Sequence, residues 1–249
     1  MTTPVAIILA AGKGTRMVSD LPKVLHRMAG EPLVAYPIRA AREVGASTVV
    51  LVVGYREALV RQEVGERFSV DEGWLRFATQ AEQLGTGHAV MCALPALEGI
   101  DGTALVLSGD VPLLREKTLR ALVERCEATA AGLALTTFEP PDPTGYGRIL
   151  RDADGRVVAI REHRDATLAE RAVGECNAGT YAVGLEHLRA DLPRVQRSNA
   201  QGEIYLTDLV ELAAARGEVA ALRIDPLEAA GVNTPQQLAE LEAAARARG

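Results

Sequence analysis

The stretch Val5-Ala6-Ile7-Ile8-Leu9-Ala10 runs directly into Ala11-Gly12-Lys13-Gly14-Thr15-Arg16. A continuous apolar run of this length predicts a strand buried on both faces, as in parallel sheets covered by helices. The glycines let the backbone approach a ligand closely, and consecutive N–H groups can cradle phosphate oxygens. The stretch therefore predicts an α/β fold with a ligand-binding loop after its first strand.

The rest of the first half repeats the alternation of strand and helix. Strands are expected at 48–53, 75–79, 103–107 and 133–138, and helices at 32–44, 56–67, 87–97 and 118–130. Such alternation is typical of a parallel sheet with helices on both faces. We expect a Rossmann-like, mixed but mostly parallel sheet flanked by helices.

The second half has a different pattern. Residues 148–151 and 157–161 flank Asp152-Ala153-Asp154-Gly155, a hairpin signature. We expect this hairpin to form a small lobe over the carboxyl edge of the sheet, where open α/β folds bind ligands. Further expected elements are strands at 181–184 and 219–224, a largely helical segment at 201–216, and a last helix capped by Thr234, with Gln237 completing a capping box.

The whole-chain composition narrows the functional class. A net charge of −6 argues against non-specific binding of nucleic acid. Three widely spaced cysteines indicate reduced thiols and not a disulfide framework. The apolar start is too short to span a membrane and lacks a basic leader. We expect a single cytoplasmic domain over residues 1–249 that binds neither nucleic acid nor membrane.

A local cluster of positive charge follows the first strand. Lys13, Arg16, Lys23 and Arg27 lie in a short stretch with one acid, Asp20. The cluster favours an anionic ligand, although a tight strand–helix turn with solvated charges has the same pattern. A P-loop is excluded because no glycine stands five residues before Gly14, and a dinucleotide fingerprint is disfavoured because Met17 replaces its third glycine and Gly54-Tyr55-Arg56 replaces the acid after the second strand.

Several segments together resemble one family. The stretch from Leu9 to Met17 and Leu21-Pro22-Lys23-Val24-Leu25 are similar to the signature of sugar-nucleotide pyrophosphorylases. The chain further resembles the bacterial N-acetylglucosamine-1-phosphate uridylyltransferases over essentially its whole length. The segments that carry this narrower resemblance are 80–88, 109–113, 142–149, Glu162-His163 and 231–233.

The resemblance implies a nucleotide site. Leu9, Ala10, Ala11 and Gly12 would lie against the nucleotide, and Arg16 and Lys23 would act in catalysis at its phosphates. The base would be bound by Gln80, Gln83, Gly85 and Thr86. Glutamine amides both donate and accept, which suits the imide edge of uracil, although a glutamine-rich loop can also simply cap the next helix.

The resemblance also implies a magnesium site and an acceptor site. Asp110 and Asn233 would be the protein ligands of Mg²⁺, as hard oxygen donors should be, although each also suits an ordinary turn. Gly147, Glu162 and Asn177, with Asn233, would bind the sugar, and Tyr205 and Thr207 would line the same pocket. Cys176 and Ala178 depart from the commonest family residues, which leaves selectivity between sugars open.

The implied reaction is the transfer of a uridylyl group from UTP to N-acetylglucosamine 1-phosphate, which gives UDP-N-acetylglucosamine and pyrophosphate. No general base is required because the attacking phosphate is largely dianionic, its second pKa being about 6. His26, His88 and His163 are accordingly expected to be structural polar residues. Alternatives are a sister enzyme for another sugar 1-phosphate or base, a non-catalytic nucleotide-sugar sensor, and, least favoured, a dinucleotide-dependent oxidoreductase.

One family feature is not expected in this sequence. The bifunctional members of the family continue into a left-handed β-helix of hexapeptide repeats with acetyltransferase activity. Residues 1–249 contain no such repeat. We therefore expect no acetyl transfer by this chain.

Overall fold

The computed structural model describes residues 2–68 and 72–248. Its centre is a twisted sheet in which β1 (Val5–Leu9) lies between β4 (Val49–Val53) and β6 (Thr103–Ser108), with β5 (Leu75–Thr79) beyond β4. These four strands are mutually parallel. The apolar sequences of β1, β4 and β6 are buried on both faces, as expected for strands covered by helices.

The other side of the sheet contains a reversal of direction. β10 (Cys176–Gly184) is antiparallel to β6 and to β7 (Leu133–Phe138), and β11 (Ala220–Arg223) pairs parallel with β7. The predicted mixed, mostly parallel sheet is confirmed. Because β10 runs backwards, its first residues lie at the same edge as the carboxyl ends of β6 and β7.

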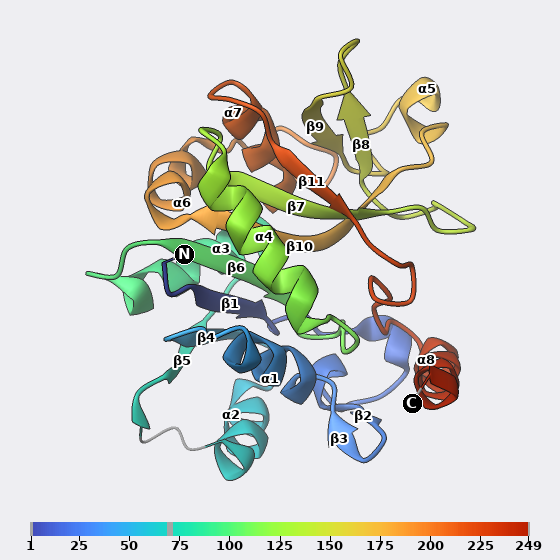
Figure 1. Cartoon of the computed structure of the whole chain (residues 1–249). Coiled ribbons are helices and arrows are strands. Elements are labelled where there is room, and N and C mark those ends of the chain that lie inside the picture. The colour runs from blue at the N-terminus through green and yellow to red at the C-terminus, as the bar shows by residue number, and fades with distance from the viewer. Residues whose placement is uncertain (1, 69–71, 249) are drawn as a thin grey trace.

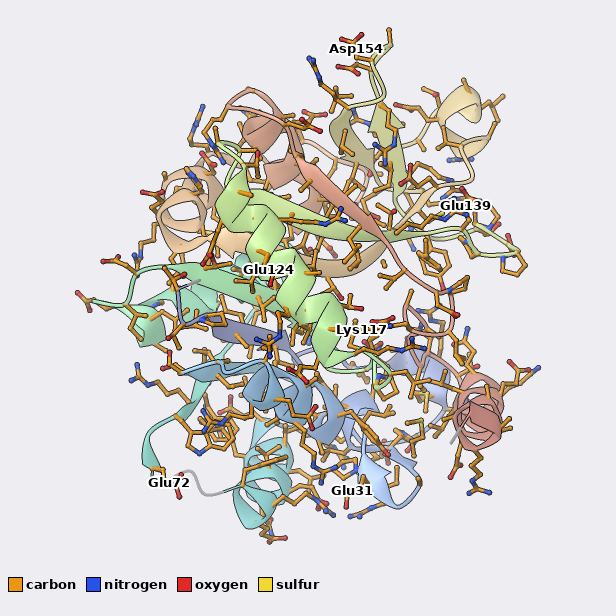
Figure 2. All side chains as sticks on the ribbon, viewed as in Figure 1. Glu31, Glu72, Lys117, Glu124, Glu139 and Asp154 are labelled. Atoms are coloured by element: carbon orange, nitrogen blue, oxygen red, sulfur yellow. The ribbon has the colours of Figure 1, made fainter. Side chains whose placement is uncertain are left out.

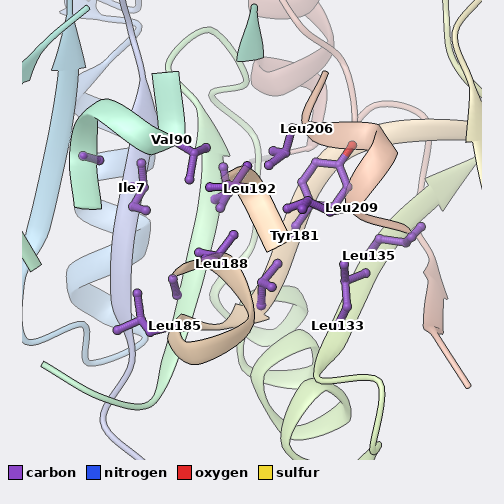
Figure 3. Close-up of a cluster of buried hydrophobic side chains, with 14 of the residues drawn as sticks. Ile7, Val90, Leu133, Leu135, Tyr181, Leu185, Leu188, Leu192, Leu206 and Leu209 are labelled. Atoms are coloured by element: carbon purple, nitrogen blue, oxygen red, sulfur yellow. The ribbon is translucent and has the colours of Figure 1, made fainter. Parts of the chain in front are cut away.

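Helices cover both faces of the sheet (Figure 1). One face packs against α1 (Ala35–Glu43), α2 (Glu57–Arg67) and α4 (Glu116–Ala128). The opposite face packs against α3 (Thr86–Ala93), α6 (Leu185–Asp191) and α7 (Leu209–Ala214). Figure 3 shows the second core, where Ile7, Leu188 and Leu209 come from three separate elements. Side chains alternate between the two cores along β1: Ile7 belongs to the second core and Ile8 to the first.

The predicted hairpin forms a lobe beside this sheet. β8 (Arg148–Arg151) and β9 (Val157–Arg161) pair antiparallel, and α5 (Leu168–Arg171) follows them. In Figure 1 the hairpin and α5 stand together above β7 and β10. Cys176 at the start of β10 pairs with Arg148, which joins the lobe to the sheet.

The segment after β1 meets the last helix in a small separate core (Figure 1). A short ribbon of β2 (Arg27–Met28) and β3 (Glu31–Pro32) contacts α8 (Pro235–Arg248). Met17, Met28, Leu33, Val232 and Leu241 are buried there. The last segment is thereby held against the loop that follows β1.

Three predicted helices differ most from the structure. The helix expected at 32–44 begins at Ala35 because Pro32 belongs to the β2–β3 ribbon. The helix expected at 87–97 ends at Ala93, and a 3₁₀ turn containing Pro95 follows. Residues 201–205 are not helical, because Asn199 accepts hydrogen bonds from the backbone N–H groups of Gln201 and Glu203 and diverts the chain before α7.

Charged side chains project from many elements in the view of Figure 2. Figure 2 shows Lys117 and Glu124 projecting from α4 toward the viewer, and Glu139 and Asp154 projecting at the edge of the hairpin lobe. In the described ranges, no helix combines the length and apolar character needed to cross a bilayer.

Candidate active site

A cavity of about 340 Å³ opens at the carboxyl edge of the parallel strands. The strand order changes direction at β1, because β4 lies on one side of it and β6 on the other. The cavity lies at this switch point, where open α/β sheets bind ligands. Ten predicted site residues line it: Leu9, Ala10, Ala11, Gly12, Lys23, Gln80, Gln83, Gly85, Thr86 and Asp110. Val24, Ala89, Ser108 and Glu203 complete the lining.

The glycine-rich loop is held firmly at its start and is open at Gly12. The carbonyl of Ala11 accepts hydrogen bonds from the backbone N–H of Tyr55 at 3.1 Å and from Nε2 of Gln83 at 2.7 Å. A Cβ built on Gly12 would meet no atom within 4 Å. The space beside Gly12 is therefore available to a ligand that approaches the backbone.

The predicted base-binding loop is packed against a distant segment. Thr86 Oγ1 accepts a hydrogen bond from the backbone N–H of Leu206 at 3.0 Å. Gly85 has a φ of 107°, and a Cβ there would lie 2.5 Å from the carbonyl oxygen of Ile204. The Thr86 hydroxyl thus fixes the 204–206 segment, and Gly85 is required for the close packing of two loops.

Four polar side chains from three parts of the chain converge beside the cavity. Lys23 forms an ion pair with Asp110, and Lys23 Nζ also donates to Asn233 Oδ1 at 3.2 Å. Arg16 Nη2 donates to the same Asn233 oxygen at 2.9 Å. Lys23 and Asp110 are mostly buried, whereas Arg16 is exposed. Arg16 and Lys23 therefore share one hydrogen-bond acceptor, Asn233 Oδ1, which lies more than two hundred positions away in the sequence.

Asn233 is itself fixed by the start of α8. Thr234 Oγ1 accepts from the backbone N–H of Gln237 at 3.1 Å, so the predicted cap is confirmed. The predicted reciprocal bond is wrong by one residue, since Gln237 Oε1 accepts from the backbone N–H of Asn233 at 2.9 Å. The reason is that the chain turns at Asn233, where Val232 is bonded to the carbonyl of Asp110.

The donor atoms of this cluster suit a hard cation. Oδ2 of Asp110 and Oδ1 of Asn233 both bind one positive group, the ammonium of Lys23, which stands in for a cation. Carboxylate and amide oxygens are the ligands that Mg²⁺ prefers, usually with waters and substrate phosphates. Within residues 2–68 and 72–248, no group of three or more His, Cys, Asp or Glu side chains could hold a metal unaided. A divalent ion here would need ligands from a bound triphosphate.

Three of the predicted sugar-binding residues, Gly147, Glu162 and Asn177, form a second group under the hairpin lobe, whereas the fourth, Asn233, bonds to Lys23 and Arg16. The backbone N–H of Asn177 donates to the carbonyl of Gly147 at 2.9 Å, and Thr207 Oγ1 donates to Glu162 Oε1 at 3.1 Å. A Cβ on Gly147 would lie 2.8 Å from Ile160 Cγ2 and 3.4 Å from Glu162 Oε1. Glycine at 147 therefore keeps this backbone close to the carboxylate.

Burial dominates the electrostatics of the acceptor group. Burial raises the pKa of Glu162, against the lowering effect of the Thr207 hydrogen bond. Burial also raises the pKa of Tyr205 to about 12. Glu162 and Tyr205 line a neighbouring cavity of about 390 Å³ and not the one beside Gly12. Glu203 lines the first cavity and Tyr205 the second, so residues 203–205 adjoin both.

Comparison with known proteins identifies the fold family. The family model of the MobA-like NTP transferase domain matches residues 6–178. The chain belongs to this family.

Curated relatives support the narrower resemblance of the motifs. The bifunctional protein GlmU of Anaeromyxobacter dehalogenans is 51% identical over 238 residues, which is 95% of this chain and 48% of that protein. GlmU of Geobacter metallireducens is 49% identical over 98% of the chain, and GlmU of Paracidovorax citrulli is 52% identical over 96%. The chain spans about half the length of these relatives. The resemblance predicted from the motifs is confirmed.

One buried residue of this NTP transferase was not assigned a role from its sequence. Arg148, 1% exposed, is among the largest fully buried side chains described. Its guanidinium donates to the carbonyls of Tyr146 at 2.5 Å and Arg171 at 3.4 Å and lies 3.5 Å from His163 Nδ1. It thereby connects the residue before Gly147, which is Tyr146, with the residue after Glu162, which is His163.

A second missed residue is Tyr181. Its buried hydroxyl accepts a hydrogen bond from Asn177 Nδ2 at 2.5 Å, while Asn177 Oδ1 accepts from the backbone N–H of Gly179. A register shift in β10 between Asn177 and Tyr181 brings these side chains together. No sequence spacing indicates a bulge of this kind, although Gly179, with a φ of 78°, was a local signal.

Proposed function

We propose that this NTP transferase transfers a uridylyl group from UTP to N-acetylglucosamine 1-phosphate and releases pyrophosphate. The observation that carries the proposal is the convergence of Arg16, Lys23, Asp110 and Asn233 beside a cavity lined by Gln80 and Gln83. Cations and a carboxylate in one place suit a triphosphate with its metal. The amide-bearing loop suits a nucleobase.

Mg²⁺ is the proposed cofactor, held by Asp110 and Asn233. When bound, it would neutralise charge on the phosphates of the nucleotide. Lys23 Nζ bonds to both of these oxygens, so its ammonium would have to turn toward the phosphates for a metal ion to reach them. Arg16, which is exposed and bonded only to Asn233 Oδ1 among the described residues, is free to bind the same phosphates.

The chain's own residues then have distinct tasks. The acceptor phosphate attacks the α-phosphorus, and pyrophosphate departs on the opposite side. Lys23 and Arg16 stabilise the charge that develops on the transferred and leaving groups. Gly147, Glu162 and Asn177 hold the sugar, with Glu162 accepting a hydrogen bond from a sugar hydroxyl. Positioning and charge stabilisation are sufficient, so no side chain has to remove a proton.

We also propose that the reaction takes place in the cytoplasm. Cys92, Cys126 and Cys176 are all free thiols. This is the state expected in a reducing compartment.

Release of pyrophosphate tests the assignment directly. UTP, CTP, ATP and GTP should each be combined with N-acetylglucosamine 1-phosphate, glucose 1-phosphate and galactose 1-phosphate in the presence of Mg²⁺. We expect the pair of UTP and N-acetylglucosamine 1-phosphate to give the highest kcat/KM. A preference for glucose 1-phosphate or for another triphosphate would refute the substrate assignment and leave the family unchanged. Binding of nucleotide without turnover of any pair would favour a sensor.

A further inference from the structure

The hydrogen-bond partners of the Gln80 side chain fix which amide atom is the nitrogen and which is the oxygen. Gln80 follows β5 and is 5% exposed. Its Nε2 lies 3.0 Å from the carbonyl oxygen of Gly85 and 3.2 Å from Nδ1 of His88. A carbonyl oxygen can only accept, so the atom facing Gly85 must be the amide nitrogen. Both amide hydrogens are then used within the protein.

This orientation fixes the tautomer of His88. Nδ1 must accept the second hydrogen bond of Nε2, so the ring proton lies on Nε2 of the imidazole. That nitrogen is 3.8 Å from Sγ of Cys92, one helical turn further along α3. Burial raises the pKa of the Cys92 thiol, which keeps the sulfur neutral and able to accept weakly. A chain of hydrogen bonds thus runs from Cys92 through His88 to Gln80.

The amide is left with one atom to offer a ligand. No hydrogen bond between described residues uses Oε1 of Gln80, and Gln80 lines the cavity beside Gly12. Oε1 is only an acceptor. Among pyrimidines, uracil has an N–H at position 3, whereas cytosine has a lone pair there. An acceptor at this place favours uracil and repels cytosine.

We propose that His88 is a positioning residue that sets base selectivity by holding Gln80 with Oε1 toward the nucleotide. The proposal rests on the proposed uridylyl transfer and adds a residue that does not touch the substrate. Without an acceptor at the place of Nδ1, one buried N–H of Gln80 would have no partner, which is unfavourable. The amide would then turn or leave its place, and Oε1 would no longer be fixed.

Two matched substitutions separate this role from simple packing. His88→Asn places a carbonyl oxygen near the position of Nδ1, whereas His88→Gln reaches the position of Nε2 and leaves Nδ1 unreplaced. The measurement is kcat/KM for UTP and for CTP with one sugar phosphate. We expect His88→Gln to lower the ratio of UTP to CTP by about tenfold or more, and His88→Asn to restore most of it. Equal ratios in both variants and the unsubstituted enzyme would overturn the proposal.

A second measurement does not depend on activity or on a variant that folds. Long-range ¹H–¹⁵N correlation spectra of the unsubstituted protein distinguish the two imidazole tautomers. We expect His88 to carry its proton on Nε2, and a proton on Nδ1 would overturn the proposal. If the unsubstituted enzyme does not use UTP, the proposed function is refuted. The role of His88 can still be tested in that case, because the tautomer and the affinities for UTP and CTP can be measured without turnover.

Discussion

Two parts of the candidate site hold their polar groups in opposite ways: the nucleotide side, around Lys23, Asp110 and Asn233, and the acceptor side, around Gly147 and Glu162. At the nucleotide side, Lys23 and Asp110 compensate each other's charge, and Asn233 bonds to Lys23 and Arg16. At the acceptor side, Glu162 has a hydroxyl for a partner and a pKa raised by burial. The first arrangement can exchange its internal ion pair for a charged ligand. The second fixes Glu162 by a hydrogen bond from a neutral hydroxyl, which suits the neutral sugar of the proposed reaction.

The difference predicts that loss of one charge disrupts the nucleotide side most. We expect Asp110→Ala to lower kcat by at least about 100-fold, the scale seen when a key electrostatic partner is removed. The free energy of unfolding should also fall, because Lys23 loses its charged partner. Rates measured against Mg²⁺ concentration, beside thermal melts, separate the two effects.

Asp110→Asn is the matched control for that experiment. It retains an oxygen and loses the charge, so it should need more Mg²⁺ and show an intermediate rate. Asn233→Ala should raise the Mg²⁺ requirement less, because a neutral ligand contributes less. Near-normal turnover of Asp110→Ala at ordinary Mg²⁺ would show that the cluster is only structural.

Two glycines of the nucleotide side should respond differently to one added methyl group. Gly85→Ala should lower the free energy of unfolding by about 1–3 kcal/mol or more, because a Cβ would meet the Ile204 carbonyl at a positive φ. Gly12→Ala should leave stability nearly unchanged, since its Cβ meets nothing, but should weaken UTP binding. Urea unfolding and nucleotide titration measure these quantities. Equal stability losses would mean that Gly12 is a folding residue and not part of an open site.

The sequence indicated more of the residues that meet at the nucleotide side, because that side is built from short contiguous loops. Gly12, Gln80 and Asp110 each follow a strand of the parallel set, and parallel strands bring their carboxyl ends to one edge. The pairing of Lys23 with both Asp110 and Asn233 could not be predicted, because it depends on the packing of α8 against the first loop.

The acceptor side depends on features without a periodic signal. The reversed strand β10 and its bulge before Tyr181 depend on pairing with distant strands. The non-helical turn at Asn199 depends on the hydrogen bonds that its side chain accepts from the backbone two and four residues further on. Arg148 begins β8, and the order of polar and apolar residues in that strand does not predict that the arginine is buried. The predicted helix at 201–216 was too long because the Asn199 side chain competes with the helix for these backbone N–H groups.

Arg148 offers a way to perturb the acceptor side alone. In Arg148→Lys one ammonium cannot reach Tyr146, Arg171 and His163 together. The loops that carry Gly147 and Glu162 should then move, and KM for the sugar phosphate should rise by about tenfold, with KM for UTP unchanged. Steady-state kinetics with each substrate varied in turn test this. A parallel rise in both KM values would contradict the separation of the two sides.

The smallest expected effect concerns the pH dependence of the free energy of unfolding. It tests whether Glu162 on the acceptor side is a buried carboxyl group, unlike the paired charges of the nucleotide side. Burial raises the pKa of Glu162, so the folded state retains this proton to a higher pH than the unfolded state does. The contribution of Glu162 is therefore fully present below the ordinary carboxyl pKa and is lost as the pH rises through the raised value. Relative to Glu162→Gln, the unsubstituted protein should become less stable between acid and neutral pH.

Glu170 is the matched control, because hydrogen bonds from Thr167 lower its pKa. The contribution of Glu170 is present above the ordinary carboxyl pKa and is lost as the pH falls through the lowered value. Relative to Glu170→Gln, the unsubstituted protein should become more stable as the pH rises, the opposite trend. Urea unfolding of the three proteins over the same pH range measures both trends. Equal slopes for the two variants would show that Glu162 is as well solvated as a surface carboxylate, and the fixed, buried acceptor site would have to be abandoned.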